Sequence, residues 1–138
     1  MGEQPLDRLL IVAGATLGRF RQQVVAEHGL SATALDLLTA LNCEDGLPHR
    51  ELAGRLGFTP ATLTPVVDVL ERTGDVRRER DGTDRRVIRV YLTPSGRRRW
   101  ASVADQVART LRETMPGEEP AVRRYLGAVL AAVQGRLT

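Results

Sequence analysis

Residues 51–76 read ELAGRLGFTPATLTPVVDVLERTGDV, and this segment indicates the class of fold. Residues 49–56 are expected to form a short helix that ends at Gly57. Thr59 and Pro60 then begin a second helix, because a threonine side chain caps free backbone N–H groups and proline fits the first helical position. Two helices joined by such a short connection are typical of a helix-turn-helix.

The spacing of apolar residues changes from a helical period to a strand period directly after this segment. Residues 76–80 and 87–92 are expected to be strands, with the apolar residues of the second strand alternating on one face. Between them, residues 81–86 read DGTDRR and contain the Asp-Gly turn signal. A hairpin that follows a helix-turn-helix predicts a winged helix-turn-helix over residues 31–93.

Helices are expected on both sides of this winged module, so the predicted fold class is mostly α with a small β-hairpin wing. Apolar residues at steps of three and four predict helices over residues 5–27, 32–42, 94–115 and 118–137. About 60 residues make a modest core, so the first and last helices need a further surface, and a second copy of the chain is the simplest one. The expected organisation is an N-terminal dimerisation helix over residues 1–30, the winged module over 31–93 and C-terminal dimerisation helices over 94–138.

Arginine is concentrated in one part of the chain, which has 138 residues and a formal net charge of +3. All 20 basic residues are arginines, and residues 72–99 hold ten of them against four acidic residues. The other residues hold ten arginines against thirteen acidic residues. A strongly basic segment in an otherwise slightly acidic chain favours a polyanionic partner, such as nucleic acid or a membrane surface.

Other features narrow the class of protein. No apolar run approaches the roughly 18 to 20 residues of a membrane span, and the first residues lack the basic start of a signal peptide, so a cytoplasmic location is expected. The single cysteine, Cys43, excludes an internal disulfide framework and a cysteine-built zinc site. His28 and His49 have no partners at catalytic or metal-binding spacing, so we expect no enzymatic activity, no metal and no cofactor. His49 and Arg50 are instead candidates for phosphate contacts.

The helix that begins at Pro60 offers a polar face suited to a DNA groove. Threonine hydroxyls can bond base edges or phosphates, and threonine or alanine methyl groups can contact the thymine methyl group. For this helix alone, an ordinary amphipathic helix with a solvated threonine face is an equal alternative. The candidate DNA-binding residues of this recognition helix are Thr59, Ala61, Thr62, Thr64, Pro65 and Asp68.

The tip of the hairpin carries a second group of candidates. Arginine suits the narrow, negative minor groove of A/T-rich DNA, and a carboxylate one or two residues away can hold its guanidinium by bidentate hydrogen bonds. This pattern predicts a braced arginine finger, with a solvated charged turn as the alternative. The candidate residues of the wing are Arg78, Arg80, Asp84, Arg85 and Arg86.

Three motifs occur in a fixed order along the chain. The recognition helix ends in Leu-Glu-x-x-Gly-x-Val at residues 70–76, the wing reads Asp-Arg-Arg at 84–86, and Leu-Thr-x-x-Gly at 92–96 leads into the long helix. Together these motifs resemble the MarR family of bacterial winged helix-turn-helix transcriptional regulators. The flanking helices extend this resemblance over nearly the whole chain.

The resemblance implies an obligate homodimer with intertwined terminal helices, which binds pseudo-palindromic DNA as a ligand-responsive repressor. In the family's pattern, Arg86 enters the minor groove, braced by Asp84, and Thr62 and Thr64 face the major groove. Family members often bind small aromatic or phenolic acids between the dimer helices and the winged module. The candidate effector contacts, with packing or surface solvation as the alternative, are Phe20, Arg21, His28 and Trp100.

Two residues depart from the family's pattern. Pro65 replaces the arginine or lysine that commonly follows Thr-x-Thr, removes a backbone hydrogen bond to Ala61 and favours a kink. It supports an alternative function, a winged-helix protein-interaction module with weakened DNA binding, which the arginine cluster opposes. Asp75 replaces the usual apolar residue before the first strand, where it would either loosen the corner or pair with an arginine such as Arg72.

Overall fold

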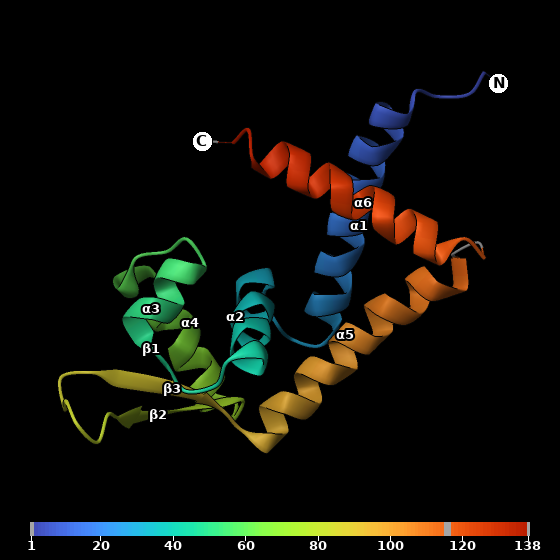
Figure 1. The fold of residues 1–138 in the computed structure, drawn as a ribbon. Coiled ribbons are helices and arrows are strands. Elements are labelled where there is room, and N and C mark those ends of the chain that lie inside the picture. Colours follow the sequence, from blue (N-terminus) through green and yellow to red (C-terminus); the bar gives the residue numbers. More distant parts are fainter. Residues whose placement is uncertain (1, 115–116, 138) are drawn as a thin grey trace. The chain divides into compact units, whose positions relative to one another are not determined.

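The computed structural model describes residues 2–114 and 117–137 and confirms a mostly helical fold with a small antiparallel sheet (Figure 1). The chain divides into two compact units after Val107, which are described separately. The elements in chain order are α1 (Leu6–Glu27), α2 (Ala32–Cys43), β1 (Leu47–Pro48), α3 (His49–Arg55), α4 (Pro60–Arg72), β2 (Val76–Arg80), β3 (Ile88–Leu92), α5 (Pro94–Thr114) and α6 (Glu119–Gln134).

Three helices begin where the sequence predicts, because a side-chain oxygen accepts a hydrogen bond from a backbone N–H of the first turn. Ser31 Oγ caps α2 at 3.0 Å from the Ala34 nitrogen, and Thr59 Oγ1 caps α4 with a bond of 3.2 Å. Thr93 Oγ1 caps α5 in the same way at 2.9 Å. These local contacts fix the starts of the helices on either side of the wing.

The C-terminal ends of α5 and α6 were also predicted, and the structure describes the predicted end position only for α6. α6 ends at Gln134 rather than at Leu137, because Gly135 takes the C-cap position. The predicted end of the long helix at Met115 and the break at Pro116 lie outside the described residues.

The sheet has the strand order β1-β3-β2, with β3 in the centre. β2 and β3 form the predicted antiparallel hairpin, with Val76 opposite Leu92. The sequence predicts only a turn before α3, but Leu47 of β1 pairs with Val90 of β3. A strand of two residues shows no periodicity, so the pattern of apolar residues does not reveal it.

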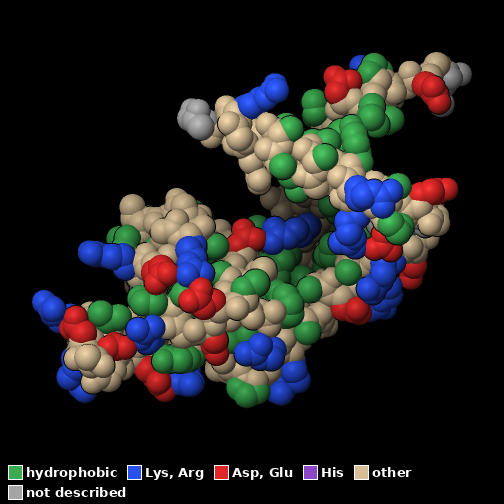
Figure 2. Space-filling view, viewed as in Figure 1, with side chains coloured by type: hydrophobic (Ala, Val, Ile, Leu, Met, Phe, Trp, Pro, Cys, Tyr) green, Lys and Arg blue, Asp and Glu red, His purple; other side chains and the backbone are tan. Residues whose placement is uncertain are grey.

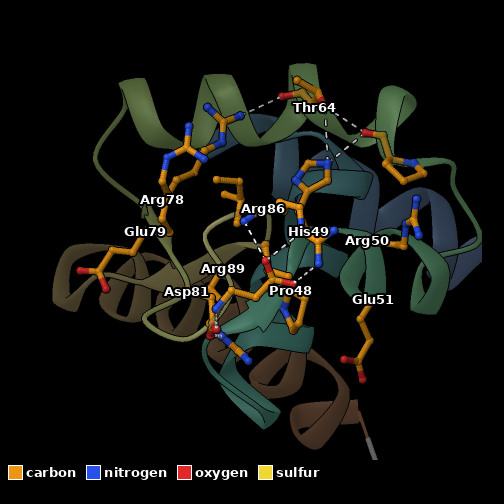
Figure 3. Close-up of a pocket in the computed structure, with 15 residues that line it drawn as sticks. Pro48, His49, Arg50, Glu51, Thr64, Arg78, Glu79, Asp81, Arg86 and Arg89 are labelled. Carbon is orange, nitrogen blue, oxygen red and sulfur yellow. Dashed lines mark hydrogen bonds and ion pairs between the residues drawn. The ribbon is translucent and has the colours of Figure 1, made fainter.

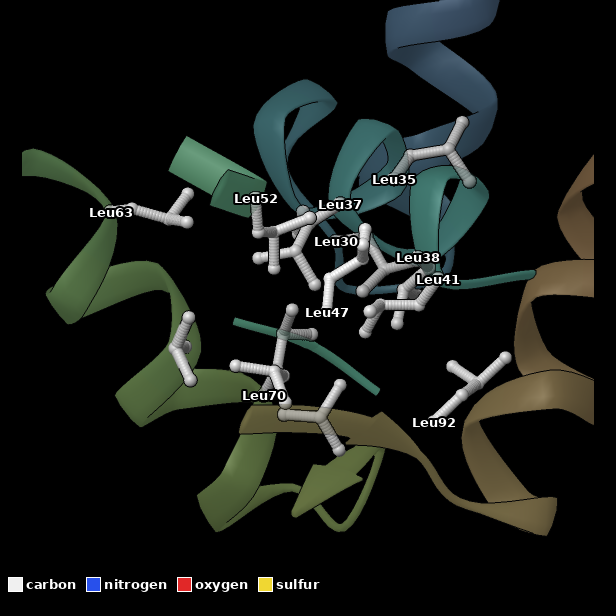
Figure 4. Packing of buried hydrophobic residues seen from close by; sticks show 14 of the residues in the cluster. Leu30, Leu35, Leu37, Leu38, Leu41, Leu47, Leu52, Leu63, Leu70 and Leu92 are labelled. Atoms are coloured by element: carbon white, nitrogen blue, oxygen red, sulfur yellow. The ribbon is translucent and has the colours of Figure 1, made fainter. Parts of the chain in front are cut away.

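A hydrophobic core lies inside the winged module, between its helices and the sheet (Figure 4). It joins the end of α1, helices α2, α3 and α4, the sheet and the first turns of α5. Its fully enclosed side chains include Leu37, Leu38, Leu41, Leu52 and Val90, together with Leu63, Val67 and Leu70 of α4. The core therefore fixes α4 against the sheet, and this packing positions the polar face of α4 relative to the wing.

The terminal helices expose much of their apolar surface in the single chain, as hydrophobic side chains at the surface in Figure 2 indicate. α1 buries Val24 and Val25 near its end, whereas Ile11 near its start is 72% exposed. Within the described part of α6 no residue is buried, and Leu130 is 59% exposed. Among the described helices, none alone has the length and apolar composition to cross a membrane. Of the described helices, only α1 and α2 counted together have that length and composition, and this pair is bent by 88°.

Candidate nucleic-acid interface

A groove of about 1230 Å³ lies between the wing, the start of α3 and the recognition helix α4 (Figure 3). Charged side chains of the wing line it together with polar side chains of the two helices. The structure thus brings predicted residues from three separate segments to one groove: His49, Arg50, Thr64, Arg78, Arg80, Asp84 and Arg86.

Arg86 forms the predicted contact with Asp84 at the tip of the wing. The Asp84 carboxylate accepts from Arg86 Nε at 3.1 Å, from Arg86 Nη2 at 3.2 Å and from the Arg86 backbone nitrogen at 3.1 Å. These bonds from Arg86 hold the pKa of Asp84 below its ordinary value. The Arg86 side chain is nevertheless 90% exposed, so the guanidinium is oriented and accessible at once.

Asp81 holds the base of the wing, a role that the sequence analysis missed. Its carboxylate accepts from Arg89 Nε at 2.6 Å and from the backbone nitrogens of Thr83 and Asp84 at 3.1 and 2.9 Å. Arg89 Nη1 in turn donates to the Gly46 carbonyl oxygen at 2.8 Å, which ties the wing to the segment before β1. The available signal was an aspartate that opens the turn, since such a residue commonly accepts from backbone amides two residues on.

Acidification is expected to loosen the wing only below about pH 4. Bonds from Arg89 and from the two backbone amides lower the pKa of Asp81 from 3.8 to about 2. The folded wing therefore favours the ionised form, so this stabilisation is complete above the unfolded pKa and is lost as the pH falls through about 2. The amide proton of Thr83, which donates to Asp81, should titrate with a midpoint near 2 when followed by NMR, and Asp81→Asn should abolish that titration. A midpoint near 4 would contradict the assignment.

Arg78 points back onto the recognition helix. Its guanidinium pairs with Asp68 and, at 3.3 Å, with Glu71 and with the Thr64 carbonyl oxygen. The Arg78 backbone nitrogen also donates to Glu71 at 3.0 Å. Arg78 and Asp68, two of the predicted DNA-binding residues, therefore connect β2 to α4.

The other two arginines of the wing differ in their contacts. Arg80 Nη1 donates to the Arg85 carbonyl oxygen at 2.9 Å and so supports the loop from inside. Arg85 is exposed beside Arg86 at the tip.

The predicted polar face of α4 is exposed along its length. Thr59, Ala61, Thr62, Thr64, Pro65 and Asp68 all lie at the surface. Thr59 Oγ1 lies 2.8 Å from Thr62 Oγ1, and Thr64 Oγ1 donates to the Pro60 carbonyl oxygen at 2.9 Å. His49 Nε2 lies 2.9 Å from the same carbonyl oxygen and 3.4 Å from Thr64 Oγ1, so His49 docks the start of α3 against α4 (Figure 3). Arg50 is exposed next to it.

Pro65 lies inside α4 without ending it. The helix continues from Pro60 to Arg72, although proline cannot donate the bond that the Ala61 carbonyl oxygen would receive. Buried residues before and after Pro65, such as Leu63 and Val67, hold the helix on the core through this position.

Asp75 pairs with Arg99 of α5 rather than with Arg72. Its side chain is only 2% exposed, and Arg99 Nη1 donates to Asp75 Oδ2 at 2.6 Å. The corner between α4 and β2 is thus tied to another helix rather than loosened. The predicted pairing of Asp75 with an arginine is confirmed, but the partner is Arg99 and not Arg72.

The four candidate effector residues lie apart from the groove of the wing. Arg21 pairs with Asp36 at 2.5 Å, His28 Nε2 lies 3.0 Å from Gln106 Oε1, and Trp100 Nε1 donates to Thr39 Oγ1 at 3.0 Å. Phe20 packs against the core.

A separate cavity of about 390 Å³ lies beside α4. Its wall is lined by Gly29, Leu30, Ser31, Ala34, Pro65, Val66, Val69, Leu70, Thr73 and Arg99, and by none of the four candidate effector residues.

Comparison with known proteins agrees with this geometry. Residues 30–88, which include the helix-turn-helix and most of the wing, match the model of the MarR family. The chain belongs to the MarR family. The braced wing and the exposed face of α4 are therefore the parts of a MarR-family winged module.

Curated relatives of this MarR-family chain are named as transcriptional regulators and not as enzymes. The HTH-type transcriptional regulator TtmR of Methylorubrum extorquens is 38% identical over 85 residues, which cover 62% of this chain and 44% of TtmR. The uncharacterised HTH-type transcriptional regulator YdgJ of Bacillus subtilis is 31% identical over 109 residues, which cover 79% of this chain and 66% of YdgJ. The matched part of the chain thus spans less than two thirds of each of these relatives.

Solved structures share the fold over almost the whole chain. A MarR family protein from Bacillus stearothermophilus has a TM-score of 0.79 at 26% identity, covering 94% of this chain and 93% of that one. The transcriptional repressor CouR, solved bound to a 23-mer DNA duplex, has a TM-score of 0.75 at 26% identity, covering 94% and 92%.

Proposed function

We propose that this MarR-family chain is a homodimeric transcriptional repressor that binds a pseudo-palindromic DNA operator. The observation that carries the proposal is the finger formed by Arg86, which is 90% exposed yet held along one edge of its guanidinium by both carboxylate oxygens of Asp84. A cation oriented in this way suits the narrow minor groove, where the negative potential is strongest. The solved complex of the repressor CouR with a DNA duplex supports the same role for the fold.

The recognition helix supplies the second half of the proposed contact. Its exposed face carries Thr62 and Thr64 on the same unit as the wing. With α4 in the major groove, the wing reaches the adjacent minor groove, and His49 and Arg50 lie beside the same groove of the protein for phosphate contacts. Arg78 and Arg80 support this arrangement from within the wing.

The terminal helices support the homodimer. α6 and the first turns of α1 expose apolar side chains such as Leu9, Tyr125 and Leu126, at 42% or more. Such surface favours burial against a partner, and a second copy of the chain brings an identical apolar surface. We therefore assign dimerisation to residues 1–30 and 94–138 and DNA binding to residues 31–93.

The cavity beside α4 supports ligand control of the repressor. Its walls are mainly apolar, with Val66 and Val69 from the recognition helix, and Arg99 is the one charged residue among those that line it. A small molecule with an apolar body and an acidic group fits this chemistry, and its binding would act directly on the position of α4.

DNA binding is expected to weaken steeply with salt. If the dimer neutralises about six to ten phosphates, the logarithm of the association constant falls with the logarithm of salt concentration with a slope of about −5 to −9. Fluorescence anisotropy with duplexes from the region upstream of the chain's own gene measures this slope, and the stoichiometry should be two chains per duplex. A scrambled duplex of the same length and composition is the control. Failure to bind any of these duplexes at low salt would instead favour the protein-interaction module.

A further inference from the structure

We propose that the buried ion pair between Asp75 and Arg99 fixes the angle between the winged module and α5, and thereby sets the operator half-site spacing that the dimer accepts. The inference rests on the proposed function, because this spacing matters only when two winged modules bind one duplex. It assigns both residues a positioning role and no contact with DNA.

Asp75 is the buried end of this pair. The residue is 1% exposed, the only buried charged residue among those the structure describes. Its Oδ2 accepts from Arg99 Nη1 at 2.6 Å and from Thr73 Oγ1 at 2.6 Å. A carboxylate removed from water is stable only when its charge and its hydrogen bonds are satisfied, so the position of Arg99 relative to this corner is narrowly defined.

Arg99 joins three segments of the winged unit. It lies in the second turn of α5, and its other terminal nitrogen donates to the carbonyl oxygen of His28, at the end of α1. Its planar guanidinium presents its donors in fixed directions, unlike the single rotatable ammonium of a lysine. The corner after α4, the second turn of α5 and the end of α1 are therefore held together by one side chain.

A second contact lies at the start of α5, where Thr93 is the residue before the helix and Gly96 lies in its first turn. Thr93 donates through Oγ1 to the Gly74 carbonyl oxygen at 2.6 Å and through its backbone nitrogen to the Asp75 carbonyl oxygen at 3.1 Å. Gly96 lies so close that a Cβ atom there would come within 2.0 Å of the same Asp75 oxygen. Two contacts at different heights on α5 fix its direction relative to the end of the recognition helix.

The consequence for DNA follows from the proposed dimer. α5 leads from the wing into the C-terminal dimerisation helices, so the angle at its first two turns determines how far apart the two recognition helices lie. Because successive major-groove half-sites are about 34 Å apart, a rigid dimer accepts one separation and rejects others. A dimer with a loose joint accepts several.

The test uses the full chain and an operator defined by footprinting with the unmodified protein. Half-site separation is then varied by one and two base pairs, and affinity is measured for each duplex and for a single half-site. The unmodified dimer should lose affinity on the order of tenfold with each change in separation, because only one half-site is then engaged at a time. In Asp75→Asn the duplex with the optimal separation should lose affinity, whereas duplexes with other separations should not. The affinities for all separations should then agree to within about threefold, which flattens the profile of affinity against half-site separation. The affinity for a single half-site should stay the same.

Two further variants separate positioning from stability. The pair Asp75→Leu with Arg99→Met removes the charges together, a replacement that often preserves stability, and it should flatten the profile as Asp75→Asn does. Glu44→Gln removes an exposed carboxylate that pairs with Arg55 at 2.8 Å, and it should keep the original profile. Circular dichroism and sedimentation confirm that each variant is folded and dimeric.

A measurement without DNA completes the test. In a Cys43→Ser background, spin labels at Thr83→Cys on the two wings report their separation by pulsed electron resonance. The distance distribution should broaden when Asp75→Asn is added. Variants with the original spacing profile and an unchanged distance distribution would overturn the inference, whereas an unmodified protein that binds no DNA would overturn the proposed function instead.

Discussion

Gly96→Ala is expected to lower the free energy of unfolding by about 3 kcal/mol, at the upper end of the usual cost of overpacking. A Cβ atom at this position would lie 2.0 Å from the carbonyl oxygen and 2.8 Å from the carbonyl carbon of Asp75. These are backbone atoms, so no side chain can turn aside to make room. α5 must shift away from the corner, and this shift also strains the contacts of Thr93 and Arg99 with that corner. Thermal unfolding should show a Tm lower by roughly 10 °C.

Gly54→Ala is the matched control for this prediction. Gly54 lies inside α3, has an ordinary negative φ angle and has open space where the Cβ atom would be. Alanine there should raise stability by roughly 0.5 to 1 kcal/mol, because glycine disfavours the interior of a helix. Equal stability of Gly96→Ala and the unmodified protein would contradict the close approach of α5 to the corner.

Arg86→Ala is expected to lower the affinity for operator DNA by roughly 30-fold or more, because each of the two wings loses a groove contact of about 1 to 3 kcal/mol. The side chain is 90% exposed and makes its ion pair with the neighbouring Asp84, so its removal costs little stability. Asp84→Ala should have a smaller effect of the same sign, because the arginine keeps its charge but loses its fixed orientation. Affinity, measured by fluorescence anisotropy at several salt concentrations, should also show a salt slope that is less steep by about one per wing.

Arg77→Ala supplies the control for loss of charge alone. Arg77 lies on the same wing, but it pairs with Glu79 and its guanidinium lies 4.5 Å from the centre of the Tyr91 ring. Its removal should leave the affinity within about twofold. If the two variants weakened binding equally, the wing would act through its net charge and not through a finger.

Features that depend on neighbours in the sequence were predicted from the sequence. The predicted helix starts at residues 32, 60 and 94 are confirmed, because the hydroxyls of Ser31, Thr59 and Thr93 each reach a backbone nitrogen three residues later. The contact of Asp84 with Arg86 has the same local origin, since the two residues are two positions apart. Both partners of such a contact lie within one turn of the chain, so the contact depends on local geometry and not on the tertiary arrangement.

Features that depend on tertiary contacts were not predicted. Arg99 is 24 positions from Asp75, and only the packing of α5 brings them together, whereas Arg72, the partner named from the sequence, is three positions away. The contact of the Arg78 side chain with α4 was not predictable for the same reason, because on a strand this side chain could face either the helix or the solvent. β1 consists of two residues whose pairing is set by the position of β3.

The paired arginines behind the tip of the wing bear on how the protein would search for its operator. Arg78 and Arg89 each face a carboxylate of the same chain and are much less exposed than Arg86. An arginine that is already neutralised in this way releases fewer counterions from an arbitrary duplex, so contacts with random sequence are weaker than the number of arginines suggests. A short residence time of the protein on random DNA shortens its search for the operator. It also raises the ratio of operator-bound to non-specifically bound protein, without any gain in affinity for the operator itself.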